Sequence, residues 1–413
     1  MKNTLKFVVF VFVGTFCLIF DAFYNSFPIV YSDTSTYIAS GFELETPFDR
    51  PITYGLFLRF FSLNGLSLWF VIFFQALILS YLIFLLAKLV TSEKSFLKSG
   101  LFTILFLSLF TSVSWTVSQI MPDIFTSIGL LCMTLILLGM FKPKTMFLLY
   151  IIFFISVAMH MSHLLLFSLT LITIFCLRRF ILPKQSYPKA NFQIITLLLL
   201  TAASIVTMGS AFSKSRNVFF IGAMVEHGIV KNYLNDNCNT KRYKLCAYKD
   251  SLPDKAYKFI WDEKSPFYKI GGWKGTKEEF SQIIHETLTQ PKYIAMHIQE
   301  SLKATLQQLM LFSIGDGNGS FVKGTLLHER VSKYFSKDLT AYTASKQNQS
   351  HLDFLPFLNT VFFIVIVLSL LILMFLWIKF ANILNRHTKS IGIIFIISII
   401  LNAWGLWYIC KCN

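Results

Sequence analysis

The sequence predicts an all-α polytopic membrane protein with about nine transmembrane helices and an inserted, mainly α-helical exoplasmic domain. Hydrophobic residues make up 55% of the 413 residues and charged residues only 14%, and 45 residues are Phe. The mean hydropathy of +0.61 lies far above that of an ordinary soluble domain. Several apolar runs exceed the roughly 18 residues that a bilayer crossing needs.

Apolar runs separated by short polar turns indicate where the spans lie. The fifth and sixth are expected as two short helices that meet at His160–His163, or as one broken helix, because their common run is long for one crossing and short for two. The spans are expected near residues 5–24, 68–90, 100–117, 124–141, 146–159, 162–178, 191–211, 355–379 and 390–410.

Lys and Arg residues concentrate in alternate loops, including those that contain Lys2, Lys142 and Arg178. The positive-inside rule therefore predicts that these loops and the N terminus are cytoplasmic. The first span is long and lacks a small-residue cleavage site, so we expect it to be retained rather than removed as a signal peptide. We accordingly expect a protein of the bacterial inner membrane whose first polar loop faces the periplasm.

The formal net charge of +16 does not indicate a nucleic-acid partner. Cytoplasmic anchors explain many of the positive residues, because anionic headgroups attract each one by about 1 kcal/mol. The chain has no basic strip interleaved with aromatic residues and no nucleic-acid-binding motif. The lipid bilayer is the partner that this charge pattern favours.

Residues 25–67 form the first polar loop, and we expect the candidate catalytic chemistry there. The loop combines acids, a cation and aromatic residues, namely Asp33, Asp49, Arg50, Tyr37 and Tyr54. Such a set at a membrane surface indicates chemistry on an anionic lipid. The alternative is a helical connector whose charged side chains are simply solvated.

Two further places hold polar residues beside apolar spans. Asp123 follows Pro122 at the start of a helix, where the helix dipole stabilises a carboxylate, and it is either a functional acid or an exposed first-turn acid. His160 and His163 are three residues apart, which places both imidazoles on one helical face. That geometry suits phosphate hydrogen bonding or a metal, although interfacial histidines are more often packing residues. No metal or other cofactor is favoured.

The polar residues 212–354 are expected to form an exoplasmic domain between a membrane module of residues 1–211 and the C-terminal helices of residues 355–413. A long amphipathic helix in this segment is interrupted at Pro291. Cys238 and Cys246 lie close enough in sequence for a small disulfide loop in an oxidising compartment, and a metal pair is the weaker alternative because no CxxC spacing accompanies them.

The first polar loop resembles that of the GT-C superfamily of polyprenyl-phosphate-dependent glycosyltransferases, which includes protein O-mannosyltransferases and lipid A aminoarabinose transferases. The resemblance covers mainly residues 1–210 and rests on topology and on two short motifs, SDTSTY at residues 32–37 and FDRPITY at residues 48–54. The chain departs from members with a paired acidic motif, because Thr34 follows Asp33. It also departs from members with a second Pro after the basic residue, because Ile52 follows Pro51.

The resemblance implies roles for individual residues. Asp33 matches the catalytic carboxylate that takes a proton from the acceptor, Arg50 matches the cation that binds the lipid phosphate, and Asp123 lies where some members have another catalytic acid. We further expect Tyr54, His160 and His163 to contribute to the phosphate site. Tyr37 and Asp49 are expected on the acceptor side of the same site.

The expected function is therefore an inverting transfer of a sugar from a polyprenyl-phosphate donor to a glycan, lipid or protein acceptor of the cell envelope. Such a displacement needs a base for the incoming hydroxyl and a positive charge for the departing phosphate. One alternative is a transferase of phosphoethanolamine or acyl groups, for which the sequence offers no evident nucleophile. The other is a lipid-linked sugar flippase or transporter, for which charges in mid-span and an internal repeat would be typical.

Overall fold

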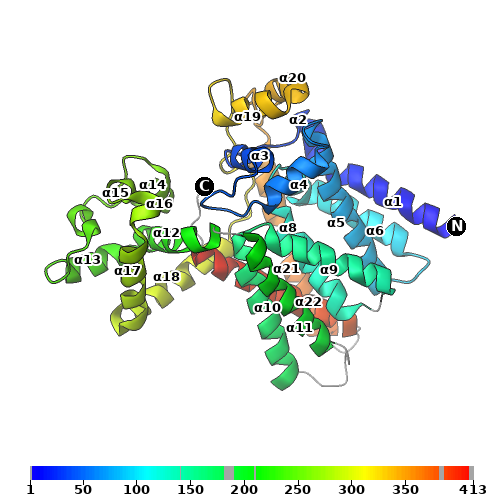
Figure 1. Cartoon of the computed structure of the whole chain (residues 1–413). Helices are drawn as coiled ribbons and strands as arrows, with labels where there is room; N and C mark the ends of the chain where they lie inside the picture. Colours follow the sequence, from blue (N-terminus) through cyan, green and yellow to red (C-terminus); the bar gives the residue numbers. More distant parts are fainter. Residues whose placement is uncertain (1, 140, 181–189, 209–210, 381–385, 409–413) are drawn as a thin grey trace. The chain divides into compact units, whose positions relative to one another are not determined.

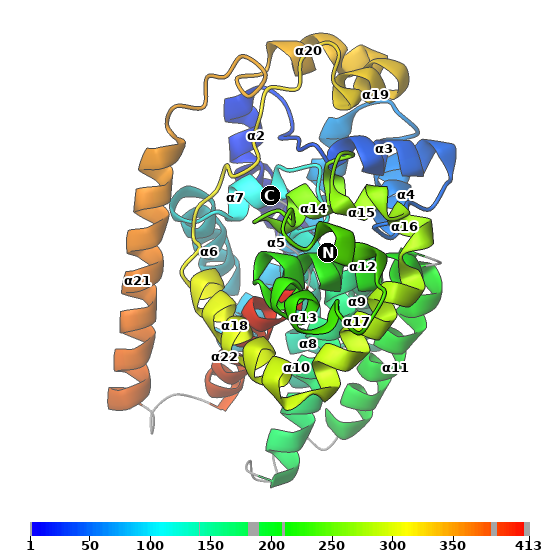
Figure 2. The same ribbon diagram turned by 90° about the vertical axis from the view of Figure 1, so that its left-hand side faces the viewer.

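The computed structural model describes residues 2–139, 141–180, 190–208, 211–380 and 386–408 (Figures 1 and 2). Within these ranges the chain is helical, and β structure is limited to one isolated bridge between Ile29 and Gln119. The chain divides into two compact units. Unit 1 comprises Met1–Glu45, Ile52–Thr207 and Phe312–Ile396, and unit 2 comprises Thr46–Pro51, Met208–Leu311 and Ile397–Asn413.

Unit 1 contains the predicted apolar helices and the short helices of the polar loops. Its helices are α1 (Lys2–Leu18), α2 (Phe20–Asn25), α3 (Thr34–Glu43), α4 (Thr53–Phe61), α5 (Leu68–Val90), α6 (Phe96–Phe110), α7 (Val113–Val117), α8 (Ile124–Leu138), α9 (Pro143–Ala158), α10 (Met161–Phe180), most of α11 (Ala190–Met208), α19 (Leu326–Tyr334), η2 (Ser336–Asp338), α20 (Leu339–Ala344) and α21 (Leu355–Phe380). The last helix, α22 (Arg386–Tyr408), extends from unit 1 into the residues assigned to unit 2.

Three helices of the described chain are long and apolar enough to cross a membrane, namely Leu68–Val90, Met161–Arg179 and Leu355–Lys379. Shorter apolar helices lie at Thr4–Leu18, Phe96–Phe110, Ile124–Leu138, Pro143–Ala158, Asn191–Thr207 and Lys389–Trp404. They coincide with the other expected spans, but they fall below the crossing length, so the count of nine spans stays a prediction. At the expected fifth and sixth spans, α9 and α10 are separate helices that pack against each other.

Small residues allow α1, α5 and α6 to pack closely. A Cβ on Gly14 of α1 would lie 2.6 Å from Ser80 Oγ of α5 and from a methyl group of Ile104 of α6. A Cβ on Gly100 of α6 would lie 2.5 Å from the ring of Phe84. Close backbone approach of this kind is how apolar helices associate where no water drives them together.

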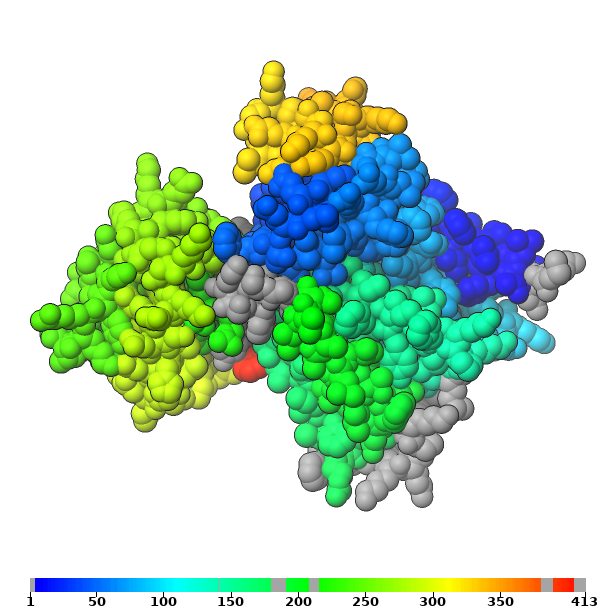
Figure 3. Space-filling model, in the orientation of Figure 1, coloured from blue at the N-terminus to red at the C-terminus, as the bar shows by residue number. Residues whose placement is uncertain are grey.

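Residues 312–354 belong to unit 1 and not to the domain in which the sequence placed them. Leu327, Val331, Phe335 and Tyr342 of this segment are buried in the same apolar core as the membrane-type helices. Figure 3 shows the α19–α20 segment in yellow and orange against the blue α3–α4 region, and α19 contacts α3. The boundary expected at residue 354 therefore lies at Leu311, because these apolar side chains pack on unit 1.

Unit 2 is a small helical unit with its own apolar core. Its helices are α12 (Ala211–Glu226), α13 (Ile229–Asn237), η1 (Lys244–Tyr248), α14 (Ala256–Trp261), α15 (Pro266–Lys269), α16 (Gly272–Gly275), α17 (Lys277–Thr289) and α18 (Pro291–Leu309). The expected interruption at Pro291 is confirmed, because α17 ends at Thr289 and α18 begins with the proline at its first position, where no backbone N–H is needed. Phe259, Phe280 and Tyr293 are among the residues buried in the core of unit 2.

Candidate functional site

Backbone hydrogen bonds join the two polar loops that carry the predicted acids of unit 1. The N–H of Ile29 donates to the carbonyl of Ser118, and the N–H of Ile120 donates to the carbonyl of Ile29, both over 2.9 Å. Thr34 Oγ1 donates to the carbonyl of Ile120 over 3.1 Å. We call residues 27–34 and 118–123 the paired loops. Asp33 lies next to the end of the first loop, directly before α3, and Asp123 ends the second loop directly before α8.

Tyr31 lies in the acidic surroundings of the paired loops, and the sequence did not single it out. Burial and the carboxylates of Asp123 and Asp316 raise the pKa of Tyr31 to about 12, partly offset by the polar groups of Trp115 and Gln119. The loop at residues 315–320 lies beside Tyr31, because a Cβ atom on Gly317 would be 3.3 Å from the Tyr31 ring. The one signal in the sequence that could have identified Tyr31 is its position two residues before Asp33.

Tyr54 and Tyr37 pack together beneath the paired loops. Their rings are 4.9 Å apart in an edge-to-face arrangement, and Tyr54 is fully buried. The Tyr54 hydroxyl donates to Gln75 Oε1 over 2.7 Å, and Gln75 Nε2 donates to the carbonyls of Val117 and Gln119 over 3.0 Å. Gln75 of α5 therefore ties α4 to the second loop. The hydroxyl of Tyr54 is therefore engaged inside the core, which counts against its expected role in phosphate binding.

Close packing of α3 on α4 fixes the position of α3, which begins directly after Asp33. A Cβ atom on Gly41 or on Gly55 would overlap the backbone or side chain of the facing helix, including Ser40 Oγ and the Gly55 carbonyl. On the far side, Glu43 of α3 forms ion pairs with Arg330 and Lys333 of α19. The two contacts hold α3, and hence Asp33 at its start, between α4 and α19.

Asp49 and Arg50 lie together in the segment of residues 46–51, which belongs to unit 2. Arg50 Nε donates to Asp49 Oδ2 over 2.7 Å, and Arg50 Nη2 donates to the same oxygen. The Arg50 side chain is 12% exposed and the Asp49 side chain 11%. The structure thus groups the predicted site residues in two sets, with Asp33, Tyr37, Tyr54 and Asp123 in unit 1 and Asp49 and Arg50 in unit 2.

The two histidines occupy the turn between α9 and α10. His163 is buried, with Nδ1 donating to the carbonyl of Ser156 and Nε2 accepting from the Thr126 hydroxyl, each over 2.7 Å. His160 Nδ1 lies 2.7 Å from Ser162 Oγ, and the two imidazole rings are 5.6 Å apart. His163 therefore connects α8, α9 and α10 inside unit 1, and both of its ring nitrogens are occupied there. Among the described residues no group of three His, Cys, Asp or Glu side chains could hold a metal ion.

An apolar groove of about 510 Å³ runs along unit 1, and its wall is formed by apolar atoms. Phe57 and Phe125 line it, with their rings 5.1 Å apart. Phe125 follows Asp123 by two residues, and the Phe57 ring stacks on Tyr54. The other lining residues come from α1, α4, α5 and α9 and are Phe7, Val8, Val11, Phe12, Phe61, Leu77, Ile78, Tyr81, Leu148, Ile151, Ile152 and Ile155.

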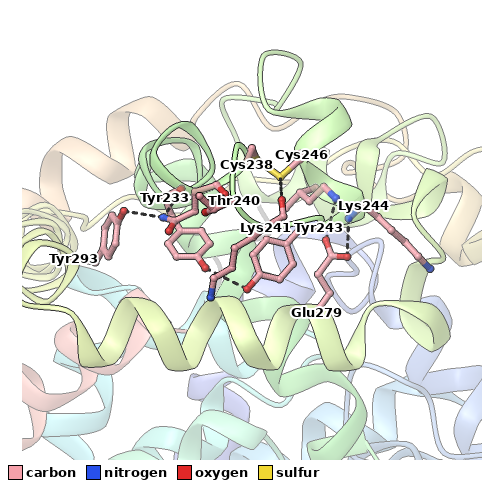
Figure 4. Close-up of a disulfide and its surroundings, with 11 residues drawn as sticks. Tyr233, Cys238, Thr240, Lys241, Tyr243, Lys244, Cys246, Glu279 and Tyr293 are labelled. Carbon is pink, nitrogen blue, oxygen red and sulfur yellow. Dashed lines mark hydrogen bonds between the residues drawn. A yellow bond between two sulfur atoms is a disulfide. The ribbon is translucent and has the colours of Figure 1, made fainter.

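Cys238 and Cys246, which the sequence pairs, are joined by a disulfide in unit 2. Figure 4 shows the disulfide above α17. Glu279 of α17 accepts hydrogen bonds from the backbone N–H groups of Lys244 and Leu245, each over 2.9 Å. The disulfide and the Glu279 carboxylate together hold η1 and the loop that precedes it against α17.

Comparison with known proteins adds no relative: no family model matches the chain, and neither the curated proteins nor the solved structures contain a match.

Proposed function

We propose that this protein is a membrane glycosyltransferase of the GT-C type, which transfers a sugar from a polyprenyl-phosphate donor to a glycan, lipid or protein acceptor by an inverting mechanism. The proposal includes about nine spans, a location in the bacterial inner membrane and a site that faces the periplasm. The observation that carries it is the apolar groove, whose lining residues Phe57 and Phe125 adjoin the paired loops.

A groove with an apolar wall suits a hydrocarbon chain, because every contact replaces lipid or water with packed apolar atoms. Phe125 is two residues from Asp123, so a chain in the groove would carry its polar head toward the loops that bear Asp33 and Asp123. A lipid-phosphate donor also needs no nucleotide site. Polyprenyl-phosphate sugars combine these two properties, an apolar chain and a polar head that reacts at the membrane surface.

In the proposed reaction, Asp33 takes the proton from the acceptor hydroxyl as that oxygen attacks the anomeric carbon. The new glycosidic C–O bond forms while the bond between the anomeric carbon and the phosphate oxygen breaks, and its electron pair leaves with the polyprenyl phosphate. Asp33 is partly exposed, so water can remove the proton afterwards. Arg50 is assigned to the phosphate on the basis of its motif, and Asp49 orients its guanidinium.

The first test removes the proposed base. Asp33→Asn keeps the shape of the side chain but cannot accept the proton, so turnover should fall by about 10²- to 10⁴-fold while the donor still binds. The measurement is release of polyprenyl phosphate by the purified protein in nanodiscs, supplied with polyprenyl-phosphate sugars and an envelope extract. Glu45→Gln is the matched control, because Glu45 is an exposed acid of the same polar loop. Full activity of Asp33→Asn, or no release from any donor, would refute the proposal.

The second test fills the groove. Val8 of α1 lines the groove and is 43% exposed, whereas its neighbour Val9 is 50% exposed and is not part of the lining. Val8→Trp should raise the donor KM by about tenfold with kcat little changed, because the substitution blocks ground-state binding of the chain. Val9→Trp adds the same bulk and should leave KM unchanged. Equal effects of the two substitutions would show that the groove does not hold the donor.

A further inference from the structure

Unit 2 contains a pocket of about 330 Å³, at the lower end of the sizes that hold small ligands. We call it the Trp273 pocket. It combines aromatic and polar side chains, unlike the apolar groove of unit 1. Its lining residues are Phe48, Asn217, Val218, Trp273, Lys274, Thr276, Lys277 and Phe280.

Trp273 is held in place by neighbouring rings and by the turn before it. Its ring contacts those of Phe219, Trp261 and Phe267, with centroids 5.4 to 6.1 Å apart. The preceding Gly271–Gly272 pair has φ angles of +123° and +55°, which side chains rarely allow. The indole is therefore a fixed element of the pocket wall and not a mobile surface side chain. Aromatic faces offer flat apolar contact to the C–H groups of a sugar ring, with weak C–H interactions in addition.

Two lysines give the pocket a positive rim. Lys274 and Lys277 are both exposed, and the structure records no ion pair for either of them within the described chain. The nearby carboxylate of Glu279 is instead engaged by the backbone of Lys244 and Leu245. The two ammonium groups are therefore available to an anionic ligand, and Lys is suited to phosphate or carboxylate as a point charge.

The remaining polar group is the amide of Asn217. Its Nδ2 donates to Ser281 Oγ over 2.9 Å, which fixes the orientation of the amide at the pocket. A fixed amide beside an aromatic face can hydrogen-bond sugar hydroxyls. Phe48, 45% exposed, completes the wall from the segment of residues 46–51, two residues before Arg50. The pocket thus includes a part of the first polar loop as well as the folded core of unit 2.

We propose that the Trp273 pocket binds an anionic saccharide, a sugar that carries a phosphate or a carboxylate. Trp273 and Phe48 contact the ring, Asn217 hydrogen-bonds its hydroxyls, and Lys274 and Lys277 neutralise its charge. A role of this pocket as the acceptor site rests on the proposed function. In that case the acceptor belongs to the anionic glycans and glycolipids of the envelope. The binding itself needs neither the donor nor Asp33.

The experiment measures saccharide binding to the full-length protein in phosphatidylcholine nanodiscs by calorimetry, without donor. Tri-galacturonic acid should bind at least tenfold more tightly than neutral maltotriose. The Lys274→Gln/Lys277→Gln variant should lower the affinity for tri-galacturonic acid about tenfold, because two exposed charge-assisted contacts are lost, and leave the affinity for maltotriose unchanged. Phe48→Ala should lower the affinity for both saccharides. Lys231→Gln/Lys264→Gln removes the same charge from exposed positions outside the pocket and should change neither.

Several results would overturn the inference. The first is that no saccharide binds, and the second is that maltotriose binds as tightly as tri-galacturonic acid. The third is that Lys274→Gln/Lys277→Gln leaves the affinity for tri-galacturonic acid unchanged. The fourth is that tri-glutamate binds as tightly as tri-galacturonic acid and displaces it, which would indicate an acidic peptide instead. Competition by glucose 6-phosphate would support the inference and identify phosphate as a suitable anion. Because no donor is present, failure here leaves the Asp33→Asn result untouched, and a failed transfer assay leaves this binding result untouched.

Discussion

The apolar helices of unit 1 meet through small, aromatic and buried polar side chains, whereas the helices of unit 2 carry ion pairs around a compact apolar core. In unit 1, Gly14 and Gly100 allow close helix contacts, and Gln75 satisfies buried carbonyls. The ion pairs recorded in unit 2 include Lys241–Glu286, Lys255–Glu226, Lys258–Asp254, Lys292–Asp236 and Lys303–Glu300. Charged side chains are inexpensive where water solvates them and costly inside a bilayer. This difference is the one expected if the apolar helices of unit 1 contact lipid, as proposed, and unit 2 is surrounded by water.

The largest expected effect is a loss of stability when the buried hydrogen bonds of Gln75 in unit 1 are removed. Gln75→Leu leaves the Tyr54 hydroxyl and the carbonyls of Val117 and Gln119 without their partner, so unit 1 should lose about 3 kcal/mol of stability. Thermal unfolding in detergent measures the loss. Gln307→Leu, at an exposed position of α18, is the control and should stay within about 0.5 kcal/mol. Equal unfolding temperatures for the two variants would contradict the structural role of Gln75.

The next effect concerns the disulfide and should be confined to unit 2. Reduction, or Cys238→Ser with Cys246→Ser, releases a loop with a sequence separation of 8 residues, worth about 2.5 kcal/mol in chain entropy. Limited proteolysis should then cut unit 2 sooner while the helices of unit 1 stay protected. Intact-mass analysis with alkylation before and after reduction should differ by two blocked thiols. Two free thiols in the unreduced protein would contradict the pairing.

The smallest effect is a pH dependence of unit 2. Burial lowers the pKa of His297 in α18 from 6.5 to about 4. Between these values the unfolded chain binds a proton that the folded chain does not, so stability is full above about pH 6.5 and falls as the pH drops toward 4, by about 2 kcal/mol. Denaturant unfolding at pH 7 and pH 4.5 measures this loss. His297→Leu should flatten it, whereas His285→Gln, at an exposed position, should not.

Several features could be predicted from the sequence because local chemistry decides them. The run of apolar residues at 68–90 predicts a helix that the structure places at Leu68–Val90, since a stretch of this length and hydropathy can satisfy its backbone only as a helix. Pro291 ends one helix and begins another whatever surrounds it. The spacing of Cys238 and Cys246 likewise pairs them by proximity along the chain.

The sequence by itself determined the helical class, the apolar segments, the break at Pro291 and the position of Asp123 at a helix start. Only the tertiary structure decided that residues 312–354 pack on unit 1, that Tyr31 lies near Asp123 and Asp316, and that Gln75 engages the Tyr54 hydroxyl. The physical reason is range. Helix formation and turns depend on neighbours a few residues away, whereas these contacts join segments far apart in the chain, so they depend on how whole helices pack.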